Sequence, residues 1–336
     1  MAQIIDIVLL VFLCTVAVAT VRMRDLFGIA MLFGIFSLLS ASVFVVLDAG
    51  DVAMTEAAVG AGLTTILMLS TLAATGSRAH PRAVRWKLPL FVVTVTGAAL
   101  VYATTDMPRF GDPNAPVQTH PVAKHYIETS QEETGIPNMV TPLLASYRGF
   151  DTLGETAVVF TAGIGVLALI GRRRKKDGTP VDENHGEDIR AEHHAVVRVV
   201  GKILIPAILL YACYIQAHGD FGPGGGFQAG VVFASGLMLY LLLFGVAAAA
   251  RVAPFAVLER LIALGLLLYG GIGVLNMMLG GNFLDYRTLA ENAKDGLHYG
   301  IILIELGVGI TVAAVVTTLV FAFADHLQRG PVHRQD

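Results

Sequence analysis

Charged residues are scarce in this chain of 336 residues, because Asp, Glu, Lys and Arg together make up only 15% of it. Hydrophobic residues make up 55%, and the mean hydropathy is +0.68. Soluble domains carry about 25% charged residues, so the composition excludes an ordinary soluble protein and predicts a membrane protein. The formal net charge of −3 is too small to suggest a nucleic-acid partner.

Cysteine is also rare. Cys14 and Cys213 are the two cysteines of the chain, and both lie in apolar runs. Neither a disulfide framework nor a metal-binding cysteine pair is therefore expected. The sequence has no nucleophile paired with a base and no cofactor loop. We expect no enzyme activity, no cofactor and no structural metal site.

Long apolar runs, by contrast, are abundant. Nine of them are long enough to cross about 30 Å of hydrocarbon as helices. The predicted fold class is therefore all-α, a polytopic integral membrane protein with about nine transmembrane helices. The runs cover approximately residues 3–21, 26–47, 52–75, 86–103, 152–171, 199–217, 227–250, 257–280 and 299–324.

Basic residues predict the orientation of these helices, because Lys and Arg are enriched in cytoplasmic loops. Most of the 23 basic residues fall on the cytoplasmic side if the N-terminus lies outside and the C-terminus is cytoplasmic. Residues 104–151 then form a long outer loop, whose apolar and aromatic end suggests a segment at the membrane interface. Residues 172–198 form a polar cytoplasmic linker, and their histidines have no cysteine partners, which favours a solvated tether over a metal site.

Four predicted spans contain a single charged residue each: Glu56, Glu155, Glu305 and Lys202. A charge in hydrocarbon is costly and usually has a partner or a water path. The three carboxylates lie toward the predicted outer side and Lys202 near the inner surface. For Glu155 and Lys202, a position among the lipid headgroups explains the charge as well as a function does. For Glu56 and Glu305 we favour a function in ion translocation.

Small residues follow Glu56 in the stretch TEAAVGAGLTTILML, where Gly60 and Gly62 come about one turn later. Such residues permit close helix packing. Paired glycines also lower the cost of a helix irregularity such as a π-bulge, which would free a backbone carbonyl for water or a cation. Packing is the commoner cause, and both explanations remain open at this stage.

The stretch QAHGDFGPGGGFQAG, residues 216–230, interrupts two apolar runs with polar residues, a proline and glycines. A phosphate-binding loop is excluded by context, because the stretch has no GxxxxGK[ST] pattern and no preceding strand. Two alternatives remain: a structural turn, or a polar outer vestibule. In the second case His218 and Asp220 would relay protons, since histidine is the side chain that ordinarily changes charge near neutral pH.

The same stretch resembles the signature of the MnhB family, the B subunits of the Mrp multisubunit Na+/H+ antiporter, and the match continues to DGLHYGIILIELGVG at 295–309. TEAAVGAGLTTILML and YRGFDTLGE, residues 147–155, resemble the C-terminal part of the large A subunit of the same antiporter, which also occurs as small subunits of membrane-bound hydrogenases. The motif residues of the B-like half are Pro223, Gly224, Gly225, Gly226, Phe227, Gln228 and Gly230.

The resemblance implies four parts. Residues 1–103 are similar to the C-terminal part of the large A subunit (MbhD-like), and residues 104–171 form an interfacial segment plus a helix (MbhE-like). The linker 172–198 joins them to an MnhB-like four-helix domain at 199–326. The implied location is a bacterial inner (cytoplasmic) membrane. The implied partners are the large antiporter-like A and D subunits and the small C, E, F and G subunits, with lipid, Na+ and H+.

The implied function is that of a membrane subunit of a cation/proton antiporter driven by the proton motive force. Glu56 is the first candidate for ion translocation and for transient Na+ binding, and Glu155 is the second. Glu305, His218, Asp220 and Lys202 are weaker candidates. The alternative is a structural or coupling subunit of a redox-driven complex related to energy-converting hydrogenase or complex I, in which Glu56 couples distant events.

Overall fold

The computed structural model describes residues 2–78, 86–170 and 195–328. Within these ranges the chain is helical and has no named strand, and nine helices are long and apolar enough to cross a membrane. The predicted all-α polytopic fold is thus confirmed, whereas the predicted orientation of the termini remains a prediction. Most of the predicted linker 172–198, with its histidines, lies outside the described residues.

The nine candidate spans begin and end close to the predicted apolar runs. The third span combines three segments, and the other eight are single helices. The spans are α1 (Ala2–Arg22), α2 (Leu26–Val46), α3 (Gly50–Glu56) with η1 (Ala57–Thr64) and α4 (Thr65–Thr75), α5 (Lys87–Thr104), α9 (Gly149–Ile170), α10 (Ala195–His218), α11 (Gly226–Val252), α12 (Phe255–Met278) and α13 (Ala293–Gln328).

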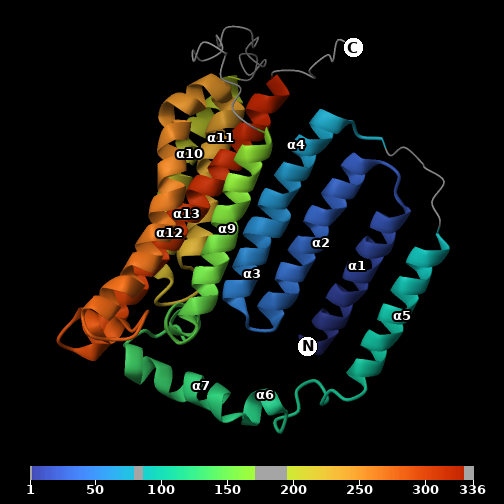
Figure 1. The fold of residues 1–336 in the computed structure, drawn as a ribbon. Helices are drawn as coiled ribbons and strands as arrows, with labels where there is room; N and C mark the ends of the chain where they lie inside the picture. The colour runs from blue at the N-terminus through green and yellow to red at the C-terminus, as the bar shows by residue number, and fades with distance from the viewer. Residues whose placement is uncertain (1, 79–85, 171–194, 329–336) are drawn as a thin grey trace.

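The longest helix, α13, lies in the bundle with α9, α10, α11 and α12 and packs closely against α9, α11 and α12 (Figure 1). Its buried side chains include Ile301, Ile304 and Phe321, and these belong to the main hydrophobic core. On one side of this bundle α4, α2 and α1 follow one another in a row, with α5 beyond them (Figure 1). Nearly all side chains of α5 are exposed, so this helix faces lipid or another protein.

The third span contains the irregularity that its glycines allow. Residues 57–64 form a π-helix, η1, immediately after Glu56. Gly60 also serves close packing, since a Cβ there would lie 2.8 Å from the Ser37 Cβ of α2 and 2.7 Å from Glu56 Oε1. Packing and backbone irregularity therefore coexist at this position rather than exclude each other.

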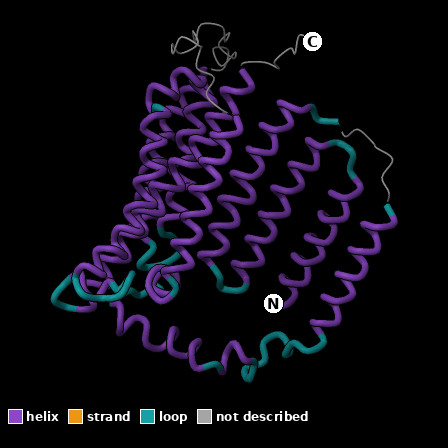
Figure 2. Tube along the Cα trace, viewed as in Figure 1, coloured by secondary structure: helices purple, strands orange, loops and turns teal. Residues whose placement is uncertain are grey.

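Most described loops gather at one end of the bundle (Figure 2). There α6 (Pro116–Thr119) and α7 (Pro121–Thr134) connect α5 to the short helix α8 (Val140–Pro142) and the π-turn η2 (Leu143–Tyr147). The sequence predicts this segment at the membrane interface, but its end packs on protein, with Thr141 and Ala145 buried.

A tyrosine on η4 (Tyr286–Leu289) helps to hold this end in place. The Tyr286 hydroxyl donates to the Ala145 carbonyl at 3.1 Å. Burial raises the pKa of the Tyr286 phenol, which keeps it a neutral donor.

Candidate functional site

The glycine-rich loop between α10 and α11 has a backbone that only glycine accommodates easily. Gly225 has φ 102° and ψ −178°, a conformation that is almost exclusive to glycine. The next residue, Gly226, lies so close to the Glu305 carbonyl that a Cβ would overlap it. The motif therefore fixes a sharp turn and brings the first residues of α11 against α13, as the prediction of a structural turn requires.

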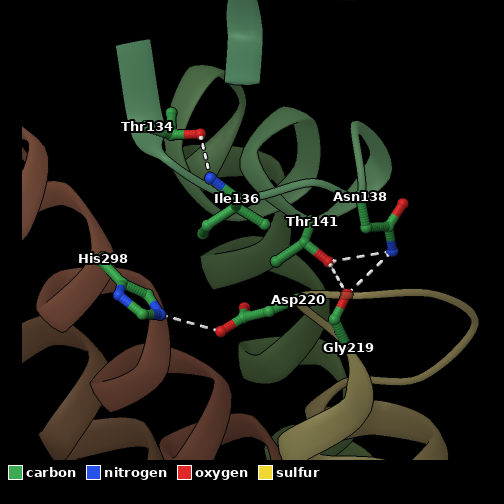
Figure 3. A network of polar contacts seen from close by, with 7 residues as sticks. All are labelled: Thr134, Ile136, Asn138, Thr141, Gly219, Asp220 and His298. Carbon is green, nitrogen blue, oxygen red and sulfur yellow. Dashed lines mark hydrogen bonds and ion pairs between the residues drawn. The ribbon is translucent and has the colours of Figure 1, made fainter. Parts of the chain in front are cut away.

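Residues from the α7–α8 segment hold this loop from one side (Figure 3). The Asn138 side-chain amide donates to the carbonyls of Gly219 at 2.8 Å and Gly222 at 3.1 Å. The Thr141 hydroxyl also donates to the Gly219 carbonyl, at 2.7 Å. In addition, the backbone N–H of Asn138 donates to the Asp220 carbonyl at 3.0 Å. Because several bonds converge on this short stretch of backbone, the loop has one defined position.

Helix α3 holds the same loop from the other side. The Gly224 N–H donates to Asp51 Oδ1 at 3.2 Å, and Gln228 Nε2 donates to the Thr55 hydroxyl at 2.9 Å. The ring of Pro223 lies against Gly50, where a Cβ would come within 2.8 Å of it. Three parts of the chain that are far apart in sequence thus meet at the glycine loop.

A cavity of about 520 Å³ lies at this junction. Three carboxylates, those of Asp51, Glu155 and Glu305, line it from three different helices. The other lining residues are Thr55, Val140, Thr141, Leu144, Ala145, Thr152, Val158, Val159, Gly224, Gly225, Gly226, Phe227, Gln228, Ile304 and Val308. Residues with hydroxyl, amide and carboxylate groups thus line one mainly apolar space, which suits a small cation or protons.

Glu305 is partly buried, and its carboxylate lies against the glycine loop. A Cβ added to Gly219 would be 3.4 Å from Oε2, and one added to Gly225 would be 3.2 Å from Oε1. The absence of side chains at these two positions therefore leaves room for the carboxylate. The negative charges of Asp220 and Asp51 both act on Glu305, and a proton or cation in the cavity relieves this repulsion.

The cavity brings together two of the predicted carboxylates, Glu155 and Glu305, with most of the predicted motif. Glu155 is exposed at the cavity side of α9. Glu56 is not among the cavity residues, although Thr55 is. It is the last residue of α3, next to the π-helix, and its carboxylate lies near Gly60.

The remaining three candidates lie outside the cavity. Asp220 follows Gly219 in the loop and pairs with His298 of α13, with 2.9 Å between Oδ2 and Nε2. The His218 ring instead stacks on Tyr214, with the ring centroids 4.9 Å apart. Lys202 is exposed and lies over the Phe244 ring, 5.9 Å from its centroid. It is 16 residues before His218 on α10, or roughly 24 Å at about 1.5 Å per residue.

Three functional candidates were not predicted from the sequence: Asp51, Asn138 and His298. Asp51 precedes an apolar run at a helix start, where an acidic residue is ordinary. Asn138 belongs to a loop, and no local pattern links it to Gly219, 81 residues away. His298 is part of DGLHYGIILIELGVG, and its seven-residue spacing from Glu305, which places both on one face of a helix, was the available signal.

These observations define a multi-pass membrane protein whose three parts meet at one carboxylate-lined cavity. Family models match the three parts in order. The MbhD model, which describes the D subunit of MBH, matches residues 11–77, and the MbhE model, which describes the E subunit of MBH, matches residues 91–183. The model "Domain related to MnhB subunit of Na+/H+ antiporter" matches residues 196–318. Three successive segments of the chain thus match the MbhD, MbhE and MnhB-related family models, and the resemblance inferred from the sequence is confirmed.

A relative from Rhizobium meliloti (strain 1021) agrees with this assignment. It is named as a probable K(+)/H(+) antiporter A/B subunit, and it is 28% identical over 333 residues. The match covers 90% of this chain and 32% of that protein. The chain therefore spans about a third of that relative.

Two solved structures are also similar. In the structure of the Mrp complex from Dietzia sp. DQ12-45-1b, one chain is 25% identical with a TM-score of 0.74. The match covers 98% of this chain and 35% of that one. In the membrane-bound sulfane sulfur reductase, an archaeal respiratory complex, the match is 29% identical with a TM-score of 0.51 and covers 69% of this chain and 97% of that one.

Proposed function

We propose that this chain is a membrane subunit of a multisubunit cation/proton antiporter, and that it contributes to ion translocation and to assembly of the complex. The observation that carries the proposal is the cavity at the junction of the three domains, where carboxylates from α3, α9 and α13 line one space. The driving force is the proton motive force, and the chain itself catalyses no chemical reaction.

The carboxylates exchange protons for a monovalent cation. A proton or a cation in the cavity offsets the negative charge of Asp51, Glu155 and Glu305, and each can replace the other because both neutralise the same charges. The hydroxyl of Thr55 and the side-chain oxygen of Gln228 offer neutral ligands beside the carboxylates. Such oxygen ligands suit an alkali cation, and the cavity is large enough to keep part of its water.

We propose that Glu56 is the next ion-binding residue after the cavity. It follows Thr55 directly and precedes the π-helix η1, where a wider turn leaves backbone carbonyls with altered hydrogen bonding. An ion that leaves the cavity along α3 therefore meets the Glu56 carboxylate, where Na+ binds transiently.

The proposed membrane location and partner subunits follow from the resemblance to the antiporter subunits. The chain lies in a bacterial inner (cytoplasmic) membrane with its N-terminus outside, and the cavity is at the outer end. The partners are the large A and D subunits and the small C, E, F and G subunits of the antiporter. The exposed helix α5 and the exposed faces of α1 are available for contact with them or with lipid.

A second candidate function is that of a coupling subunit in a redox-driven complex. It is favoured by the likeness to the sulfane sulfur reductase, since the match covers 97% of that chain. In this case the cavity carboxylates change protonation when electrons move elsewhere in the complex, and the chain transmits that change.

Ion exchange without electron transfer distinguishes the two functions. The purified complex is reconstituted into liposomes, a pH gradient is imposed, and uptake of Na+ and of K+ is measured without any electron donor or acceptor. Uptake that follows the gradient and stops in a complex lacking this chain supports the antiporter. Uptake that requires an electron donor contradicts it and supports the redox-driven complex.

A further inference from the structure

We propose that His298 and Asp220 form a proton relay that connects the protein surface to Glu305 in the cavity. The proposal rests on the proposed function, and it assigns a role to His298, which was not among the candidates predicted from the sequence.

One member of the pair is exposed to solvent and the other is mostly buried. The side chain of His298 is 45% exposed, that of Asp220 is 15% exposed, and 2.9 Å separates His298 Nε2 from Asp220 Oδ2. Figure 3 shows the two side chains pointing toward one another, His298 from α13 and Asp220 from the glycine loop. Imidazole titrates near neutral pH and can accept a proton on one nitrogen while it releases one from the other.

The inner end of the relay is Glu305. It follows His298 by seven residues on the same helix, which places the two on one face about 10 Å apart along the axis. Asp220 is linked to this end through its neighbour in the loop, since Gly219 lies against the Glu305 carboxylate. The charge of Asp220 also acts on Glu305. In the proposed path, water between the two carboxylates carries the proton where they do not touch.

Each transfer along this path has a proton donor and a proton acceptor. Water at the surface gives a proton to His298, and the ring passes the proton on Nε2 to Asp220. Asp220 releases it to Glu305 through intervening water, and His298 regains its starting tautomer by proton exchange with surface water. A cation leaves the Glu305 carboxylate when the proton arrives, so charge in the cavity is conserved.

The loop geometry favours His298 over His218 as the surface member. The His218 Nδ1 lies 3.2 Å from the Tyr214 hydroxyl, and its ring stacks on the same tyrosine. The carboxylate of Asp220, the nearest acidic residue in sequence, is paired with His298 instead. His218 therefore packs beside the loop, and the relay uses the histidine of α13.

Other titratable and charged groups lie on the elements around the pair. The segment 134–141 presents Thr134, Ile136 and Thr141, which do not titrate (Figure 3). The titratable and charged groups near the pair include Lys294, Asp295 and Glu305 on α13, Glu132 and Glu133 near the end of α7, Arg287 on η4, His218 at the end of α10, and Asp51 on α3. The Cγ and Cδ atoms of Lys294 pack on Gly135, and a protonated lysine is a donor that cannot act as a proton acceptor.

The test replaces His298 in the assembled complex. His298→Gln keeps a hydrogen-bonding side chain but cannot be protonated, and His326→Gln is the control, since His326 is an exposed histidine near the other end of α13. Cation/proton exchange in liposomes is measured from about pH 6 to about pH 9. We expect His298→Gln to slow exchange about tenfold, with a flattened pH profile, and added imidazole to restore the rate. His326→Gln leaves the rate and profile unchanged.

Two results overturn the relay. One is a His298→Gln complex with the original rate and pH profile, and the other is a loss of rate that imidazole does not restore, because that loss is structural. If His298→Gln assembles poorly, Asp220→Asn is measured instead, with the same loss expected and an unchanged profile overturning the relay. Glu305→Gln separates this outcome from the proposed function: if it stops exchange while His298→Gln does not, the relay is wrong and the cavity assignment stands.

Discussion

Replacing Gly60 by alanine tests whether the π-helix and its contact with α2 matter. A Cβ at this position would lie 2.8 Å from the Ser37 Cβ and 2.7 Å from Glu56 Oε1. The Glu56 carboxylate is at the end of a flexible chain and can rotate away, but Ser37 is short, so α2 itself must shift. Such overpacking costs about 1–3 kcal/mol.

Gly62→Ala is the matched control, because Gly62 belongs to the same π-helix and its nearest neighbour, the Ala57 carbonyl oxygen, would be 3.7 Å from the new Cβ. Both variants gain up to about 1 kcal/mol from the better helix propensity of alanine. The difference between them is therefore the overpacking alone, about 1–3 kcal/mol.

Thermal denaturation of the purified complex measures this difference. We expect Gly60→Ala to denature at a lower temperature than Gly62→Ala and to exchange ions more slowly, since Glu56 is displaced. Equal denaturation temperatures and equal exchange rates for the two variants would refute the close contact between η1 and α2.

Three further predictions concern the loop and the N-terminal half of α10. Asn138→Ala removes the side-chain hydrogen bonds to two loop carbonyls and should destabilise the complex by about 2 kcal/mol. Asn114→Ala, which changes an exposed turn, should not destabilise it, and the denaturation temperatures of the two variants are compared. Gly225→Ala forces an unfavourable backbone at φ 102° and should cost about 1–3 kcal/mol, visible as less assembled complex in membranes. Lys202→Gln should leave exchange within about twofold of the original rate, because this exposed residue is far from the cavity. A large loss would show that the N-terminal half of α10 takes part in transport.

The fold was predictable because hydrocarbon imposes simple requirements. Each span needs about 20 apolar residues and internal backbone hydrogen bonds, so run lengths alone placed all nine candidate spans of the described residues. The π-helix was partly predictable, since two glycines next to a lone glutamate allow it, but sequence does not reveal that Ser37 lies against Gly60. Propensity allows an irregular turn, and only tertiary packing selects it.

Individual residues of the site could be predicted from the sequence, but their arrangement around one cavity could not. Glu155 and Glu305 stood out because charges in apolar runs are costly, yet nothing local shows that both face one cavity. Asp51 was missed because its position at a helix start looks ordinary, and Asp220 was linked to His218 by proximity in sequence. The structure pairs it with His298, 78 residues away, since the glycine turn directs Asp220 toward α13 and leaves His218 on the end of α10.

The central claim, that the cavity carboxylates carry ions, is tested most directly by Glu305→Gln in the reconstituted complex. The control is Glu132→Gln, which changes an exposed glutamate of α7 in the same way. With equal assembly, we expect cation/proton exchange driven by a pH gradient to fall more than about tenfold in Glu305→Gln and to remain unchanged in Glu132→Gln. Exchange at the original rate in Glu305→Gln would contradict the claim.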